Sequence, residues 1–143
     1  MAKFFFLIMM ISLVSCLHSR NSVSIAAEEL EISFIEGFRR DQVAVHLNEF
    51  KIIDTVLESE KVSGFTGFNF DVQRFKKFVS IGHDNRTFNY PIKEAENLNF
   101  VVAVNEYKNS FVFDPTKGKY IGLNKDTSNK VIFWQQKHPF EYD

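Results

Sequence analysis

The sequence VAVHLNEF, residues 43–50, decides the fold class. Val43, Val45 and Leu47 are spaced by two, which is the period of a half-buried β-strand and not of a helix. Asn48-Glu49 then predicts a two-residue hairpin turn, because Asn tolerates the positive φ that such turns require. A returning strand is expected over residues 50–57, so the stretch is typical of a β-hairpin.

Short apolar segments with turn residues between them continue on both sides of this hairpin. Upstream, Leu30, Ile32 and Phe34 alternate with polar residues. Downstream, further strands are expected at 78–82, 87–92, 98–104, 111–114, 120–124 and 131–135. Pro91 would place its strand at a sheet edge. The recurrence predicts an all-β fold, a small antiparallel β-sandwich or partly open barrel of about eight strands.

Two other segments and a rival fold are left open by these patterns. Residues 71–77 are the best helical candidate, and residues 62–70 predict a strand with bulges at Gly64 and Gly67. The rival is an α+β fold with residues 28–57 helical and packed on a later sheet, as in cystatin or NTF2-like folds. Residues 43–48 argue against it, because a helix would scatter their apolar side chains over opposing faces.

Composition describes a single domain without a nucleic-acid binding surface. The chain has 143 residues, a net charge of −1, one cysteine and 17 phenylalanines. This length suits one domain, and no lysine or arginine cluster has the density expected of a nucleic-acid binder. The phenylalanine content favours strands.

Cys16, the single cysteine, ends an apolar N-terminal segment. A short basic start is followed by an apolar run over residues 4–13, and the segment closes with Leu13-Val14-Ser15-Cys16. The run has about half of the roughly 20 residues that a membrane-spanning helix needs, and it is organised like a secretory signal. The four closing residues resemble the lipobox of bacterial lipoproteins.

That resemblance implies how the N-terminus is processed. In lipoproteins the cysteine is linked to diacylglycerol and the leader is removed before it. Residues 1–15 would be the signal peptide, residues 16–27 the lipidated Cys16 and a tether, and residues 28–143 the domain. Lipoproteins that stay in the inner membrane tend to carry Asp directly after the cysteine. Leu17 occupies this position here, which implies an outer-membrane destination. The alternative is ordinary cleavage after Cys16, which would release a soluble secreted protein.

The C-terminal segments also resemble those of small uncharacterised β-sandwich lipoproteins. Residues 118–123 and 137–143 carry this second resemblance. It brings no activity with it.

Candidate catalytic and metal-binding residues are few. The histidines show no H-x-H or HExxH spacing, so neither a metal site nor a cofactor is expected; they are His18, His46, His83 and His138. His46 is expected to face solvent. His83-Asp84 would form either a catalytic dyad or an Asx-type turn, and the sequence favours the turn. We therefore expect a non-enzymatic protein.

Aromatic residues near the C-terminus are the weak candidates for binding. If Phe133 points into the core, Trp134 points outward, where Tyr120 or Tyr107 would complete an aromatic platform for a sugar or a protein. The alternative is that Trp134 belongs to the core. Asn85-Arg86-Thr87 is a glycosylation sequon or simply a polar turn.

These observations favour a lipid-anchored envelope protein that acts as a binding or assembly module. Its expected partners are the membrane, through the N-terminal lipid, and an envelope protein or glycan. One alternative is a secreted carrier of a small apolar ligand with an α+β fold. The other is an envelope hydrolase that uses His83 and Asp84.

Overall fold

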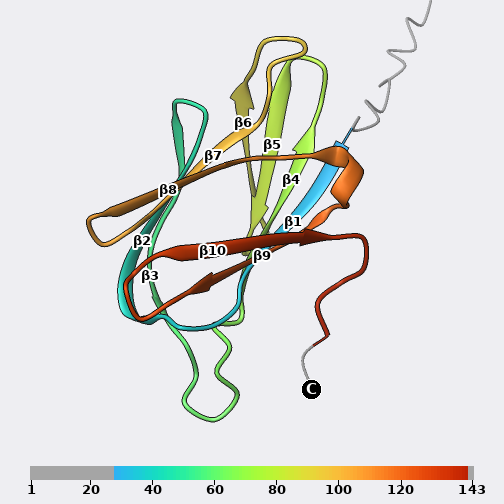
Figure 1. Cartoon of the computed structure of the whole chain (residues 1–143). Coiled ribbons are helices and arrows are strands. Elements are labelled where there is room, and N and C mark those ends of the chain that lie inside the picture. Colours follow the sequence, from blue (N-terminus) through green and yellow to red (C-terminus); the bar gives the residue numbers. More distant parts are fainter. Residues whose placement is uncertain (1–27, 142–143) are drawn as a thin grey trace, which may run out of the picture.

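The protein is a two-layered β-structure in a computed structural model that describes residues 28–141 (Figure 1). A six-stranded sheet has the order β10-β9-β1-β4-β5-β6, and a four-stranded sheet has the order β3-β2-β7-β8. The sheets do not close into a barrel. The predicted all-β sandwich is thus confirmed, with ten strands in the described residues rather than eight. The proposed lipid site Cys16, the tether and His18 lie outside the described residues.

The strands follow one another with a single short helical turn among them. Their bounds are β1 Glu28–Phe34, β2 Arg39–Leu47, β3 Phe50–Glu58, β4 Phe68–Arg74, β5 Phe78–His83, β6 Arg86–Pro91, β7 Asn99–Val104, β8 Tyr107–Val112, β9 Tyr120–Lys125 and β10 Val131–Gln136. The turn is the 3-10 helix η1, Pro115–Lys117, so the α+β alternative is wrong. In residues 28–141 no helix is long and apolar enough to cross a membrane.

The chain passes back and forth between the two sheets. After β1 it contributes β2 and β3 to the small sheet, β4 to β6 to the large one, β7 and β8 to the small one, and β9 and β10 to the large one. All neighbouring strands are antiparallel except β1 and β9, which are parallel. β1 therefore lies inside the large sheet, between β9 and β4.

Alternating apolar side chains from the inner faces fill the space between the sheets. In β7, Phe100, Val102 and Val104 are fully buried, while Val101 and Ala103 on the other face are half-buried. Each fully buried side chain of this size contributes about 1.5–3 kcal/mol relative to an exposed one. The period of two that predicted the strands is thus also what builds the core.

The helix expected over residues 71–77 is wrong. Residues 71–74 belong to β4, which pairs with β1 over its whole length, and residues 75–77 lead into β5. Phe70 and Val72 are buried, and Asn69, Asp71 and Gln73 occupy the opposite face. Asp71 is thus on the solvent face of a strand, while Arg74 shares the face of Phe70 and Val72.

The predicted hairpin turn and edge strand are present in the structure, whereas the strand predicted before β4 is a loop over most of its length. Asn48 has φ 52° in the predicted hairpin turn, and Pro91 lies in β6 at the edge of the large sheet. Gly64 and Gly67, expected as bulges in a strand, lie in the loop of residues 59–67 with φ of 79° and 66°. Glycine adopts these angles without the steric cost that a side chain would add.

Candidate functional site

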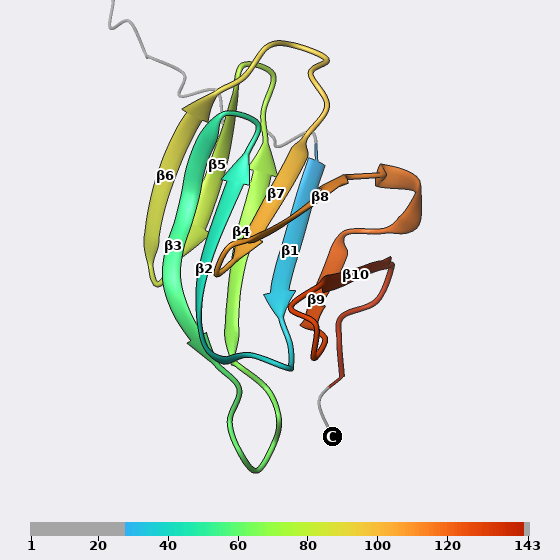
Figure 2. The same ribbon diagram turned by 60° about the vertical axis from the view of Figure 1, so that its left-hand side comes forward.

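The loop of residues 59–67 projects from one end of the sandwich. It connects β3 to β4 and extends beyond the sheets, while β1 begins at Glu28 at the opposite end (Figures 1 and 2). Val62 in this loop is 98% exposed. An apolar side chain that is fully exposed in a projecting loop marks this loop as a candidate contact surface.

Hydrogen bonds to the β1–β2 connection hold the base of the loop. The Ser59 amide donates to the Phe38 carbonyl at 2.9 Å, and the Phe38 amide donates to Ser59 Oγ at 3.1 Å. On the returning side, the Thr66 amide donates to the Ile35 carbonyl at 2.9 Å. Both ends of the loop are therefore fixed to the same short segment of chain.

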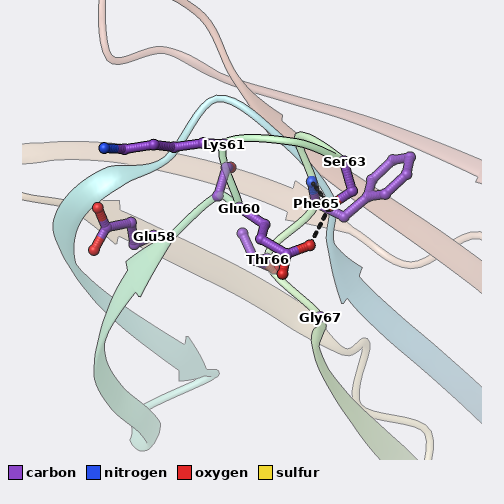
Figure 3. Close-up of a pocket in the computed structure, with 8 residues that line it drawn as sticks. Glu58, Glu60, Lys61, Ser63, Phe65, Thr66 and Gly67 are labelled. Atoms are coloured by element: carbon purple, nitrogen blue, oxygen red, sulfur yellow. Dashed lines mark hydrogen bonds between the residues drawn. The ribbon is translucent and has the colours of Figure 1, made fainter.

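The loop also carries hydrogen bonds of its own. The Glu60 amide donates to the Phe65 carbonyl, and the Gly64 amide donates to the Glu60 carbonyl, each at 2.8 Å. Ser63 Oγ donates to the Glu60 carboxylate at 2.7 Å (Figure 3). Lys61 and Phe65 point in opposite directions from this turn (Figure 3). The loop is thus a structured finger that offers different side chains on its two sides.

Four open hollows adjoin this finger. One of about 570 Å³ lies against the chain at 36–40, and one of about 520 Å³ lies on the side shown in Figure 3. A smaller one of about 250 Å³ is lined by Phe34, Phe65 and Phe68. The fourth, of about 470 Å³, reaches His83 and Asp84 at the β5–β6 turn. Residues 59–67 thus contribute to the walls of all four hollows.

Charges of both signs surround the loop. Arg40 and Glu58 form an exposed ion pair of 3.8 Å, and Glu60 and Lys61 lie beside them in the same hollow. Such a surface suits the hydrogen bonds and charge pairs of a protein or glycan partner better than it suits an apolar ligand.

His83 and Asp84 come together as a close pair. His83 Nε2 lies 3.1 Å from Asp84 Oδ2, and Nδ1 lies 2.9 Å from the Asn69 carbonyl oxygen. The imidazole also packs on the Phe68 ring at 4.4 Å. A general base needs a ring nitrogen within reach of a substrate proton. Both nitrogens of His83 already face oxygen atoms of the protein, which favours a structural role for this turn.

Trp134 and Tyr120 lie on the outer face of the large sheet. Trp134 pairs with Gly122, and its ring meets Phe140 edge-on at 5.6 Å. A Cβ atom on Gly122 would lie 2.8 Å from both rings, so the glycine makes room for them. Trp134 therefore binds the C-terminal segment of its own chain to the sheet.

The other aromatic candidate lies elsewhere. Tyr107 is on β8 of the small sheet, apart from Trp134 and Tyr120. Lys119 Nζ lies 5.3 Å from the centre of the Tyr120 ring. Phe133 is 45% exposed, and its ring stacks on that of Phe111 in β8 at 4.7 Å. Trp134 and Tyr120 thus lie on the same face of the neighbouring strands β10 and β9, whereas Tyr107 lies on the other sheet.

The remaining single residues lie on the surface or near it. His46 is half-buried on the outer face of the small sheet, and His138 and Asn85 are exposed. Within residues 28–141, no three histidine, cysteine, aspartate or glutamate side chains are grouped so that they could hold a metal ion.

Comparison with known proteins adds no relative to this description. No protein-family model, no curated protein and no solved structure matches the chain.

Sequence reasoning missed the loop at residues 59–67. The signal was present, since Gly64 and Gly67 lie among serine, threonine and charged residues, a composition typical of a loop. The three phenylalanines between residues 65 and 70 outweighed it in the strand prediction.

Proposed function

We propose that this chain is a lipid-anchored, non-catalytic module of the bacterial envelope that binds a protein or glycan partner through the loop of residues 59–67. The observation that carries the proposal is the lipobox-like sequence Leu13-Val14-Ser15-Cys16. Cys16 precedes the first residue of β1 by 12 residues. Two or three acyl chains at this position would hold the protein stably at a membrane.

The placement of the loop supports a binding role. β1 begins at one end of the sandwich and the loop projects from the other (Figures 1 and 2). An anchor joined to Glu28 by a short tether would therefore leave Val62 and the surrounding hollows at the membrane-distal end. In the outer membrane this arrangement would present the loop to envelope partners.

The packing of the described residues favours this role over the two alternatives. Phenylalanine, leucine, isoleucine and valine side chains from both sheets form one buried cluster. The apolar hollow lined by Phe34, Phe65 and Phe68 is about 250 Å³, below the roughly 300–1,000 Å³ of small-molecule pockets. A hydrolase based on His83 would need to free a ring nitrogen that now faces Asp84 or Asn69.

Metabolic labelling with tagged palmitate tests the anchor. The native chain should carry label and fractionate with the outer membrane, and Cys16→Ser should lose both properties. The thiol of Cys16 is the acceptor, so serine removes the attachment without altering the domain. An unlabelled native protein with Leu17 at its N-terminus in the soluble fraction would contradict the proposal.

Photocrosslinking in intact membranes tests the binding surface. A photoreactive side chain at Val62 should give a discrete adduct with an envelope protein or glycan. The matched control is Val112, which is 54% exposed on β8 and lines none of the four hollows beside the loop. Equal adducts at both positions, or none at Val62, would contradict binding through the loop.

A further inference from the structure

β6 is an edge strand whose outer side has no neighbour in the described structure. It pairs with β5 alone, and all of its side chains are exposed except that of Tyr90. Phe88 is 51% exposed although it lies on the same face as the buried Ile81 opposite it. We propose that β6 pairs antiparallel with β6 of a second copy of this chain, about a two-fold axis at Phe88.

The hydrogen bonding of the β5–β6 hairpin shows which amides are available. The Ile92 amide donates to the Lys77 carbonyl at 3.0 Å, so the amide of Ile92 faces β5. Hydrogen-bonded and non-hydrogen-bonded positions alternate along an antiparallel pair. The amides of Phe88 and Tyr90 therefore also face β5, whereas those of Thr87 and Asn89 face away from it.

Pro91 agrees with this assignment. It belongs to the outward-facing set by the same alternation, and it is the residue of β6 without an N–H group. Proline is tolerated in a sheet where the ladder does not need its donor. The free edge therefore offers two donors, at Thr87 and Asn89, with the carbonyl groups of the same residues as acceptors.

β3, the edge strand of the small sheet that contacts β6 through Phe50 and Tyr90, has features that block strand addition. Edge strands are protected by charged side chains, bulges and proline. β3 carries Lys51, Asp54 and Glu58, and its pairing with β2 is interrupted by a register shift between Val45 and His46. The central part of β6, Thr87 to Tyr90, has no charge, no proline and no register shift.

The remaining two edge strands, β8 and β10, contact each other. The Val131 amide of β10 donates to Asn109 Oδ1 of β8 at 3.3 Å. Phe133 of β10 stacks on Phe111 of β8 at 4.7 Å. Among the four edge strands, β6 is therefore the one best suited to accept another strand.

The outward donors, acceptors and side chains of β6 favour pairing with β6 of a second copy in this register. An axis at Phe88 places Thr87 opposite Asn89 of the second copy, so that both outward donors and both outward acceptors of each strand are used. The two Phe88 side chains face each other at a non-hydrogen-bonded pair, where side chains approach most closely. Arg86 lies opposite Tyr90 of the second copy, a favourable cation–π arrangement, so no like charges oppose each other. An axis at Asn89 would instead pair Thr87 with Pro91, which has no donor.

Disulfide crosslinking tests the register, because Cys16 is the single cysteine of the chain. In the full chain with Cys16→Ser, Phe88→Cys places two thiols at Cα positions about 4.5 Å apart, within the range of a disulfide. Thr87→Cys is the matched control, because the Cα atoms at position 87 of the two chains would lie more than about 7 Å apart. Val62→Cys, at the most exposed apolar residue, measures random collision.

Under mild oxidation, Phe88→Cys should form a linked dimer at least about tenfold faster than either control, because pairing holds the two thiols at an effective concentration on the order of 1 mM, far above that of dilute protein. A mixture of Thr87→Cys and Asn89→Cys chains should link to each other faster than either links to itself. Linking of Phe88→Cys no faster than that of Val62→Cys would overturn the proposal.

A proline variant separates strand pairing from simple contact between phenylalanines. Asn89→Pro removes an outward amide that the single chain does not use, so the melting temperature should stay unchanged. In the Phe88→Cys chain it should lower the rate of linking to that of Val62→Cys. An unchanged rate in a folded Asn89→Pro chain would overturn the pairing, and the mixed Thr87 and Asn89 experiment decides the matter if this variant does not fold.

Discussion

Where β8 and β10 meet, three stacked rings join the two sheets, whereas where β3 and β6 meet a single aromatic contact does so. On the first side, Phe111 lies 5.3 Å from Phe100 and 4.7 Å from Phe133, with the ring planes nearly parallel. On the second side, the Phe50 and Tyr90 rings are 5.4 Å apart. We call these the closed side and the open side.

A buried ion pair also joins the two sheets, between β2 and β9, the neighbour of β10. Lys125 of β9 lies 3.3 Å from Asp41 of β2, and their side chains are 7% and 9% exposed. Asn105, in the β7–β8 turn, donates to the same carboxylate at 2.8 Å, and the Arg39 amide donates to it at 2.7 Å. On the closed side the sheets are thus joined by several side-chain contacts, while the open side leaves the edge of β6 available for pairing.

The largest effect expected from this comparison is at Phe111. Phe111→Ala removes the central ring of the stack and should lower the free energy of unfolding by about 3–5 kcal/mol. Tyr90→Ala, the matched change on the open side, removes a half-buried ring at an edge and should cost about 1–2 kcal/mol. Urea unfolding of both variants measures the difference, and equal losses would contradict the distinction between the two sides.

The second effect concerns Asp41 and pH. Burial raises the pKa of Asp41. The hydrogen bonds from the Arg39 amide and Asn105, together with the Lys125 ammonium, lower it by more, so the pKa is below its usual value. A carboxyl with a lowered pKa stabilises the folded state above its unfolded pKa of about 3.9, and this contribution is lost as pH falls through the folded pKa.

Asp41→Asn should therefore destabilise the protein at pH 7 and much less at acid pH. The cost at pH 7 should be about 3 kcal/mol, because Lys125 is left buried without its carboxylate. Adding Lys125→Met should restore much of the loss. Unfolding measured between pH 7 and pH 3 gives the profile, and a loss that is independent of pH would argue that the carboxylate charge is unimportant.

The strands that could be predicted from sequence are those whose two faces differ clearly. Val43, Val45 and Leu47 are buried, and the residues between them are half-exposed. Residues 71–74 of β4 were wrongly predicted as helical, because Val72 is the single buried residue of the strand within that segment. The parallel pairing of β1 with β9 depends on how the chain crosses between sheets, which no local pattern records.

The candidate site was less accessible to sequence reasoning. Alternation left open whether Trp134 is an exposed platform or part of the core, and its contact with Phe140 needs Gly122 beneath both rings. Tyr107 could not be separated from Tyr120, because the sheet to which each strand belongs is a tertiary property. The projection of Val62 follows from the anchoring of both loop ends on residues 35–38, which are distant in sequence.

Hydrogen exchange of individual amides tests the difference between the two sides most directly. In dilute protein, the amides of Thr87 and Asn89 should exchange quickly, while those of Phe88 and Tyr90, which face β5, and that of Val131, bonded to Asn109, should be protected. Raising the protein concentration should protect Thr87 and Asn89 and leave the others unchanged. Exchange at Thr87 and Asn89 that is already slow in dilute protein, or that does not change with concentration, would contradict an open side that accepts a second copy.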